Sequence, residues 1–320
     1  MLIDVKRAAR MLKQYDDYLI LSHANPDGDT LGCAYALCGI LQKMGKRAKC
    51  LCADEVADRM KYLAEAIEVQ EFEHKTIVSV DVADRKLLGA LDKVYGDEVF
   101  LAIDHHGSRT EFAEFTLVEP DSAAACELIY EIAEELDVPL NDKIAACLYT
   151  GLSTDTGCFR FSNTTPRTHQ IAAKLMEYHF PYAGLNYMLF DMKSKGRISL
   201  EQDVYDSMEF YADDKIALVC LTLELMDRHS GSVDAEDFNG IAGLPRRIEG
   251  VELGVTVKQK EEKVFKISVR SSEKIDAAKL CEKFNGGGHA RAAGCTLEGT
   301  LDEVKAMLLP VLMNAIDNCD

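Results

Sequence analysis

Short apolar runs recur along the first half of the chain and alternate with longer stretches in which apolar residues keep helical spacing. The runs lie at 18–22, 49–53, 76–80 and 98–103. They do not alternate with polar residues, which is typical of strands buried on both faces of a parallel sheet. The stretches predicted to be helices lie at 30–44, 56–67, 123–136, 142–152 and 165–178, the last with Thr164 as cap and Pro166 in its first turn. The first half is therefore predicted to be an α/β domain whose mostly parallel sheet is flanked by helices.

The pattern loosens around 181–210, and a second α/β pattern begins after it. The elements expected there are strands at 215–221, 251–257 and 263–269, helices at 276–284 and 301–316, and a turn at Gly286, Gly287 and Gly288. The second and third strands are predicted to form an antiparallel hairpin around the polar turn 259–262. We therefore divide the chain into a larger domain at 1–185, a helical linker at 186–212 and a smaller α/β domain with a mixed sheet at 213–320.

Composition is compatible with this division. A chain of 320 residues exceeds the usual size of one domain, and 48% hydrophobic residues suffice for sizeable cores. No run approaches the roughly 18 apolar residues of a membrane span, and residues 1–7 lack the basic-then-apolar order of a signal peptide. The 11 cysteines are scattered without a Cys-x-x-Cys pair, which favours reduced thiols over disulfides or zinc sites. We therefore predict a cytoplasmic protein that does not contact membranes.

The net charge restricts the partners. At −18, the chain lacks the basic balance of proteins that track long nucleic acid, so a long duplex is not expected as a partner. A small anionic substrate remains compatible with this charge, because bound metal cations can invert the local potential.

Imidazole and carboxylate side chains gather where predicted strands end. The strand at 18–22 runs into His23, Asp27 and Asp29, with a proline and a glycine between them that force a tight turn. Open parallel sheets bind ligands at the carboxyl ends of their strands, and a mixed set of imidazole and carboxylate suits Mn²⁺. His23 and Asp27 can share one ion while Asp29 reaches a second. The alternative, that Asp29 only caps the following helix, accounts for one aspartate but not for all three residues.

The strand at 98–103 leads into Asp104, His105 and His106. Because neighbours on a strand point to opposite sides, all three can ligate only if the strand has ended. We therefore assign His105 to a metal, Asp104 to orienting an imidazole, and His106 to the substrate phosphate. The alternative is a pair of buried histidines with no ligand.

Two further carboxylates complete the set. Asp81 follows the strand at 76–80 and is predicted to bridge two ions, whereas Asp84 is predicted to cap the next helix. Asp155 lies among hydroxyls and a glycine, in a loop expected after the helix at 142–152. Each aspartate alone is commonly a turn former, so the prediction rests on their combination. The predicted ligands, enough for two ions, are His23, Asp27, Asp29, Asp81, His105 and Asp155.

The smaller domain carries a different chemistry. Consecutive glycines let a backbone approach an anion closely, and a histidine and arginines nearby can add charge-assisted hydrogen bonds to a phosphate. The alternative is a flexible loop with solvated basic residues. The residues predicted to bind substrate are Arg270, Ser271, Gly286, Gly287, Gly288, His289 and Arg291.

Together these motifs resemble the DHH phosphoesterase family, in the branch with a DHH-associated C-terminal domain. They are His-Ala-Asn-Pro-Asp-Gly-Asp at 23–29, Asp81, Asp-His-His at 104–106, Thr-Asp-Thr-Gly at 154–157 and Gly-Gly-Gly-His at 286–289. The resemblance implies one Mn²⁺ held by His23, Asp27 and Asp81, and another held by Asp29, Asp81, His105 and Asp155. It also implies that the second domain clamps a nucleotide, so that the active site lies in the interdomain cleft.

Within that family the chain is similar to the oligoribonuclease and pAp phosphatase group. The resemblance implies a manganese-dependent hydrolase that converts short oligoribonucleotides to mononucleotides, and 3′-phosphoadenosine 5′-phosphate (pAp) to AMP. The alternatives are a phosphodiesterase of cyclic-di-AMP or linear dinucleotides and, more remotely, a non-catalytic nucleotide-binding regulator. Manganese pyrophosphatases share the Asp-His-His motif but lack the glycine-rich loop. Arg109 stands where many relatives carry Asn and is given no role, and a homodimer is left open.

Overall fold

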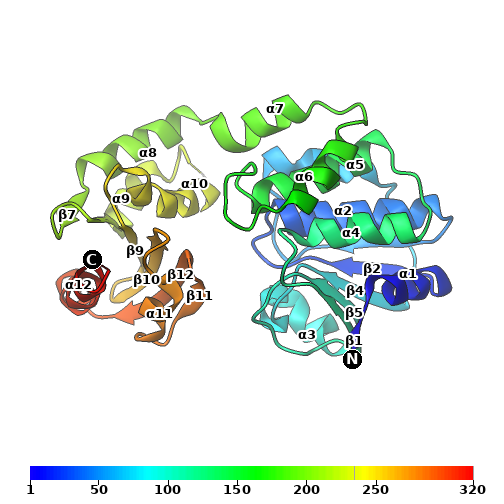
Figure 1. Ribbon diagram of the computed structural model, residues 1–320, viewed down its shortest axis with the longest axis horizontal. Coiled ribbons are helices and arrows are strands. Elements are labelled where there is room, and N and C mark those ends of the chain that lie inside the picture. The colour runs from blue at the N-terminus through cyan, green and yellow to red at the C-terminus, as the bar shows by residue number, and fades with distance from the viewer. Residues whose placement is uncertain (234, 320) are drawn as a thin grey trace. The chain divides into compact units, whose positions relative to one another are not determined.

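A computed structural model describes residues 1–233 and 235–319. The chain forms two compact units, Met1–Met192 and Lys193–Asp320, which are described here one at a time (Figure 1). The predicted domain boundaries at 185 and 213 lie on either side of the point where these units meet in the sequence, and they stay predictions.

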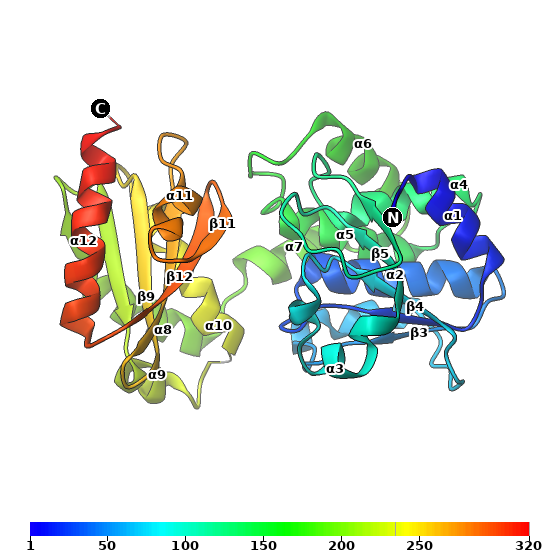
Figure 2. The same cartoon turned by 90° about the horizontal axis from the view of Figure 1, so that it is seen from below.

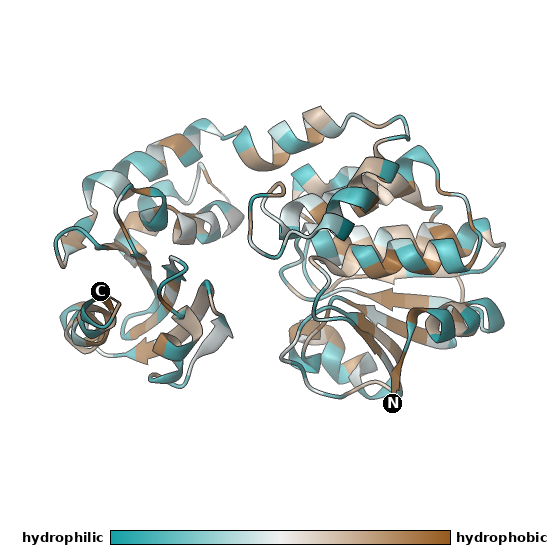
Figure 3. Cartoon of the chain, in the orientation of Figure 1, coloured by the Kyte–Doolittle hydropathy of each residue, from teal (hydrophilic) through white to brown (hydrophobic). Residues whose placement is uncertain are grey.

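The first unit is built on a parallel sheet of six strands. In spatial order the strands are β1 (Leu2–Ile3), β6 (Phe115–Val118), β5 (Val99–Asp104), β4 (Thr76–Val80), β2 (Tyr18–Leu21) and β3 (Ala48–Leu51). The four predicted strands are confirmed. Figure 3 shows the hydrophobic colour on these strands, as expected for strands that are covered on both faces.

Helices cover both faces of this sheet, so the predicted fold class is confirmed (Figure 1). The principal helices on one face are α1 (Val5–Gln14), α2 (Gly28–Lys43), α4 (Ala125–Glu135), α5 (Asp142–Asp155) and α6 (Pro166–Leu175). The smaller opposite core involves the 3-10 segment η2 (Arg85–Leu91), α3 (Asp92–Tyr95) and, beside them, the 3-10 turn η3 (Gly96–Glu98).

Three local predictions in this unit were wrong. The helix expected at 56–67 is a 3-10 segment, η1 (Asp58–Ala66), and Ala57 before it provides no side-chain cap. Helix α5 continues through Asp155 instead of ending at 152, and the Thr154 and Thr156 hydroxyls donate to the carbonyls of Thr150 and Leu152. Helix α6 is capped by Thr165 rather than Thr164, in a reciprocal capping box with Thr168.

The connector contains α7 (Tyr182–Asn186), a π-helical turn (Tyr187–Asp191) and α8 (Lys195–Asp206). The second unit then forms a mixed sheet of six strands, in which only β8 and β9 pair in parallel. Their spatial order is β11 (Gly287–His289), β12 (Ala292–Glu298), β10 (Val264–Ser271), β9 (Leu253–Glu261), β8 (Ile216–Leu221) and β7 (Glu209–Tyr211). The predicted mixed sheet and the hairpin of β9 and β10 are confirmed.

The two faces of this second sheet are covered unequally. Helices α11 (Ala277–Glu282) and α12 (Leu301–Asp317) pack on one face and form its main core (Figure 2). On the other face, α8, α9 (Leu223–His229), α10 (Ala235–Gly240) and the 3-10 turns η5 (Ile241–Gly243) and η6 (Pro245–Arg247) pack around β8 and β9. The predicted turn at 286–288 is instead largely the edge strand β11, paired with β12. No helix among the described residues is long and apolar enough to cross a membrane.

Candidate active site

Three strands of the first sheet deliver the predicted chemistry to one edge. His23 follows β2, Asp81 follows β4, and His105 follows β5, all at the carboxyl ends of adjacent parallel strands. Asp81 has a φ of 56°, in the left-handed region that few side chains adopt readily and that aspartate tolerates. This reversal ends the strand alternation and is the kind of local strain that gathers at functional sites.

One acid–imidazole group consists of His23, Asp27 and Asp81. The His23 Nε2 atom lies 3.7 Å from Asp27 Oδ1 and 3.7 Å from Asp81 Oδ2. Its Nδ1 atom lies 2.9 Å from the Ala24 carbonyl oxygen. An Nδ1–H that donates to this carbonyl leaves Nε2 as the ring's lone-pair atom, directed at the two carboxylates. Asp27 is also the N-cap of α2, where its Oδ1 accepts the N–H groups of Asp29 and Thr30.

A second group consists of Asp29, His105 and Asp155, with Asp81 adjacent. The His105 Nε2 atom lies 3.2 Å from Asp155 Oδ2, 3.6 Å from Asp81 Oδ1 and 3.9 Å from Asp29 Oδ2. Its Nδ1 atom lies 3.0 Å from the Ser122 carbonyl oxygen, so this imidazole is oriented in the same way as His23. Asp81 thus lies within reach of both groups through its two different oxygens.

Asp29 is held by the helix opposite its own. It is fully buried, and its two oxygens accept the backbone N–H groups of Ala125 and Cys126 at 2.6 and 3.0 Å. These residues begin α4, whose N-cap residue Ala124 offers no side-chain hydrogen bond. Asp29 therefore does cap a helix, but that helix is α4, and the cap of its own helix is Asp27. No side chain of residues 124–126 signals this contact in the sequence, so it could not be predicted.

The carboxylates destabilise one another. Burial and the charges of Asp29 and Asp27 raise the pKa of Asp81 well above its usual range. Burial, then the charge of Asp155, raises the pKa of Asp29 to about 6. Burial alone would lower the pKa of His105, but its hydrogen bond to Asp155 and the charges around it raise this pKa to about 10. These shifts share one cause, a surplus of negative charge among buried carboxylates, which bound cations would offset.

Divalent ions fit these donors. Two ligand atoms that each lie about 2.1 Å from an ion are about 3 to 4 Å apart, depending on the angle between them. The separations of 3.2 to 3.9 Å around the His23 and His105 Nε2 atoms fall in that range. Asp81 Oδ1 is buried and accepts no hydrogen bond from the described residues, which is costly for a carboxylate unless a ligand compensates it.

The remaining members of these motifs have distinct positions. Asp104 is buried, and its Oδ1 lies 2.8 Å from His106 Nδ1, so this carboxylate orients the His106 ring. His106 Nδ1 also lies 3.6 Å from Asp81 Oδ1, which places the ring beside the metal-fitting groups. Asp84 caps η2 by accepting the N–H of Lys86, as predicted.

Strand alternation sorts the predicted substrate-binding residues of the second unit. Arg270 pairs across the sheet with Ala292, which in turn pairs with His289, so all three share one face. Ser271 lies on the opposite face, where its hydroxyl donates to the carbonyls of Ile275 and Ala290. Arg291 precedes β12 and donates to the carbonyls of Ser272 and Ile275 at 2.5 and 2.6 Å. Ser271 and Arg291 therefore hold the 272–275 loop, and their predicted contact with substrate stays a prediction.

Arg270 is a cation that lacks a counter-ion. Within the described part of the chain its guanidinium forms no ion pair, and its recorded hydrogen bond goes to the neighbouring Val269 carbonyl. Burial lowers the pKa of this side chain. A half-buried, unpaired guanidinium is costly and favours an anionic ligand.

Two of the three glycines at 286–288, Gly286 and Gly288, are required by close contacts. At Gly288, with a φ of 141°, a Cβ atom would meet the Ala292 carbonyl oxygen at 2.6 Å. At Gly286 it would meet the Cβ of Cys295 at 2.5 Å, whereas Gly287 faces open space. Most of the glycine run therefore lies in an edge strand that ends at His289, and not in the loop that the sequence suggested.

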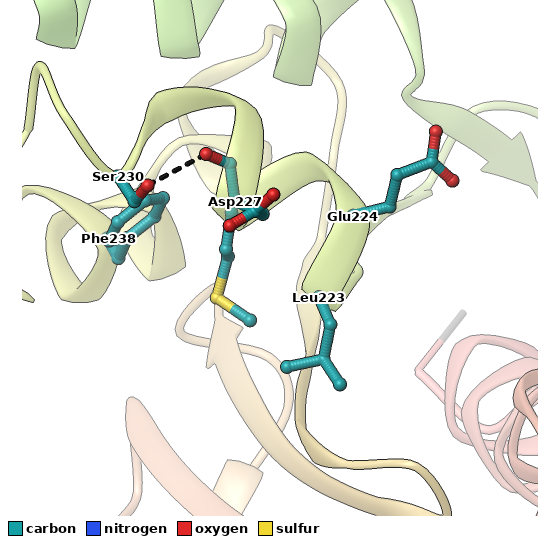
Figure 4. A pocket seen from close by; sticks show the side chains of 6 residues that line it. Leu223, Glu224, Asp227, Ser230 and Phe238 are labelled. Carbon is teal, nitrogen blue, oxygen red and sulfur yellow. Dashed lines mark hydrogen bonds between the residues drawn. The ribbon is translucent and has the colours of Figure 1, made fainter.

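A further hollow of about 550 Å³ in the second unit has the wrong charge for a phosphate. It is lined by Leu223, Glu224, Met226, Asp227, Ser230 and Phe238 (Figure 4). Its two ionisable side chains are acidic, and the Ser230 hydroxyl donates to the Asp227 carbonyl. The face that carries the unpaired Arg270 guanidinium is therefore more favourable for binding an anion than this acidic hollow.

Comparison with known proteins finds a matching domain family for each of the two units. Residues 17–152 match the model of the DHH family, N-terminal domain, and residues 216–314 match that of the DHHA1 domain. The bifunctional oligoribonuclease and PAP phosphatase NrnA of Thermus thermophilus is 30% identical over 305 residues, which cover 92% of this chain and 89% of that protein. The protein of the same name from Bacillus subtilis is 24% identical over 293 residues, covering 90% and 91%.

Solved structures share the fold. An exopolyphosphatase-related protein from Bacteroides fragilis superposes with a TM-score of 0.83 at 24% identity, covering 98% of this chain and 95% of that one. RecJ of Thermus thermophilus in complex with Mn²⁺ superposes with a TM-score of 0.52 at 16% identity, covering 98% of this chain and 54% of RecJ.

Proposed function

The chain belongs to the DHH family, and from that premise we propose that it is a divalent-metal-dependent phosphoesterase acting on short oligoribonucleotides and on pAp. The prediction of a DHH-family hydrolase is confirmed by the family assignment. The single observation that carries the metal-dependent chemistry is the pair of acid–imidazole groups that share Asp81. The choice of substrates is supported by the names of the Thermus and Bacillus relatives.

The proposed ligands follow from the two groups. His23, Asp27 and Asp81 would hold one ion, while Asp29, Asp81, His105 and Asp155 would hold the other. Bound divalent ions would supply Lewis acidity and neutralise the charge on the phosphoryl oxygens. Manganese is our choice of metal, because each proposed set includes a nitrogen donor, which suits Mn²⁺ better than Mg²⁺.

The protein's own side chains would orient the phosphoryl group, protonate the leaving oxygen and bind the nucleotide phosphate. Asp104 fixes the His106 ring, so that this imidazole can steady the phosphoryl group or protonate the leaving oxygen. Arg270 and His289, on one face of the second sheet, would bind the phosphate of the nucleotide. Location of the active site in the interdomain cleft, a cytoplasmic location and a homodimer stay predictions.

One comparison tests the proposal. Turnover of pAp, a diribonucleotide, a tetraribonucleotide, a cyclic dinucleotide and pyrophosphate is measured side by side, with Mn²⁺, with Mg²⁺ and after metal stripping. We expect hydrolysis of pAp and the RNAs, faster with Mn²⁺ and absent without metal. Activity confined to the cyclic dinucleotide or to pyrophosphate would overturn the substrate assignment, and full activity after metal stripping would overturn the metal centre.

A further inference from the structure

The face of the second sheet that carries Arg270 continues beyond it along β10. Residues 266, 268 and 270 alternate with the buried Ile267 and Val269, so they point away from the main core. The registers give three rows across this face: Arg270–Ala292–His289, Ser268–Gly294–Gly287 and Lys266–Thr296. Small side chains occupy the middle row, between the basic rows at the two ends.

A pocket lies at the Lys266 end. It has a volume of about 500 Å³, within the range of small-ligand sites. Its lining comprises Lys266, Phe284, Asn285, Gly286, Gly287, Gly294, Cys295 and Thr296, none of them acidic. This hollow is therefore uncharged except for a lysine, in a chain whose net charge is −18.

Lys266 has a second lysine as its neighbour and no counter-ion among the described residues. Lys266 is exposed and pairs across the strands with Lys258, and neither forms an ion pair in the described part of the chain. The Lys258 ammonium donates to Asn239 Oδ1 at 3.0 Å. Burial and the charges of Lys260 and Lys266 lower the pKa of Lys258. Uncompensated positive charge at one place on the sheet favours a phosphate there.

The spacing of the two basic rows sets the length of ligand that reaches both. Lys266 and Arg270 are four positions apart on β10, which is about 13 Å along a strand. A nucleotide contributes six backbone bonds of about 1.5 Å, so neighbouring phosphates lie at most about 7 Å apart. A single linkage reaches both rows only when the Lys266 and Arg270 side chains lean toward each other, whereas two linkages match the spacing of the strand positions themselves.

We propose that Lys266, supported by Lys258, forms a second phosphate subsite that engages oligoribonucleotides of three or more nucleotides and is not used by pAp. The subsite rests on the proposed function, with another phosphate of the same nucleotide chain bound at Arg270 and His289. It gives the enzyme a means to favour longer RNAs within its range, through a group that belongs to the other unit from the proposed metal ligands.

The test compares Lys266→Ala with wild type on a tetraribonucleotide and on pAp. We expect KM for the tetraribonucleotide to rise about tenfold, as for loss of one charge-assisted hydrogen bond, while kcat/KM for pAp changes less than twofold. Lys266→Arg should restore the wild-type KM. Lys279→Ala is the matched control. It removes the same charge from an exposed position of α11, which packs on the opposite face of the sheet.

A binding measurement keeps the subsite testable even if the proposed function fails. Fluorescence anisotropy follows a labelled tetraribonucleotide on the full chain in EDTA, across a series of salt concentrations. Loss of one phosphate contact should reduce the slope of log K against log salt by about 0.7 in Lys266→Ala. Unchanged affinity and slope, or equal losses with pAp and the tetraribonucleotide, would overturn the subsite. Wild-type binding without any turnover would overturn the proposed function alone.

Discussion

At the scale of single residues, Asp81 is the residue that links the two acid–imidazole groups of the candidate site. Its left-handed backbone turns the carboxylate out of the β4 alternation, and its two oxygens lie near His23 and His105 respectively. The sequence predicted its importance from its place at the end of a strand together with the other histidines and aspartates, and not from that place alone. The conformation itself could not be predicted, because Asp, unlike Gly, does not signal a positive φ on its own.

Replacing Asp81 by Asn should reduce kcat/KM for pAp by more than about 100-fold, since a neutral amide cannot bridge two cations. Asn also tolerates the left-handed region, so the fold should be retained, as far-ultraviolet circular dichroism would verify. Asp84→Asn is the control, because Asn caps a helix as well as Asp does, and its kcat/KM should stay within about twofold. Similar losses in both variants would show that Asp81 is not the shared ligand.

The same residues predict how pH acts on the metal-free protein. The pKa of Asp29 is raised from 3.8 to about 6 by burial and Asp155, and that of His105 from 6.5 to about 10 despite burial, chiefly by Asp155. In both cases the folded chain binds more protons than the unfolded chain, so the free energy of unfolding falls as pH rises through these windows. The contribution of His105 is complete below pH 6.5 and is lost as pH approaches 10.

Melting temperatures in EDTA should therefore decline between about pH 6.5 and 8.5, and saturating Mn²⁺ should raise them by more at the higher pH, because the ions replace protons. His105→Gln should flatten the decline. A melting temperature in EDTA that rises with pH over this window would contradict the assignment.

At the scale of elements, the site depends on how closely α2, α4 and α5 approach. Gly32 on α2 faces α5, where a Cβ atom would meet the Cys147 carbonyl oxygen at 2.5 Å. On α5, a Cβ atom at Gly151 would meet Asp29 Oδ1 at 2.6 Å and would also collide with the Cys126 side chain. These glycines bring the N-terminus of α4 onto Asp29, a tertiary contact that no local pattern encodes.

Gly151→Ala should therefore weaken Mn²⁺ binding by about tenfold and lower the melting temperature by several degrees, as overpacking displaces Asp29. Gly184→Ala in α7 is the control. The nearest recorded neighbour of a Cβ atom there is Pro181 Cβ at 3.8 Å, and alanine has the better helix propensity. Calorimetric Mn²⁺ titration and thermal melts of both variants decide the matter, and unchanged affinity in Gly151→Ala would contradict the packing argument.

Element prediction succeeded where periodicity was strong and failed where tertiary contacts decided. Apolar runs at 76–80 and 98–103 predicted the buried strands found at 76–80 and 99–104, whereas β1, with two residues, is too short to leave a pattern. Gly286 to Gly288 read as a turn because glycine is common in turns, yet β12 recruits most of this segment as an edge strand. Asp155 was expected in a loop, but it is the last residue of α5.

At the scale of the whole molecule, the sequence motifs predict that one unit binds metal and the other binds substrate, and this division of roles stays a prediction. Every proposed metal ligand belongs to Met1–Met192, and Arg270 and His289 belong to Lys193–Asp320. Single motifs could indicate the chemistry of each unit. They could not show that Arg291 turns away from Arg270, because that depends on the strand register.

This division predicts opposite effects of substitution in the two units. His289→Ala and Arg270→Ala should raise KM for a diribonucleotide by about tenfold or more and leave Mn²⁺ affinity nearly unchanged, because they remove groups proposed to bind phosphate. His105→Ala should weaken Mn²⁺ binding directly. Arg291→Ala should instead lower the melting temperature, because it removes two hydrogen bonds to the carbonyls of the 272–275 loop. Calorimetric Mn²⁺ titration beside kinetics distinguishes these outcomes, and a loss of metal in His289→Ala as severe as in His105→Ala would show that the second unit contributes to the metal centre itself.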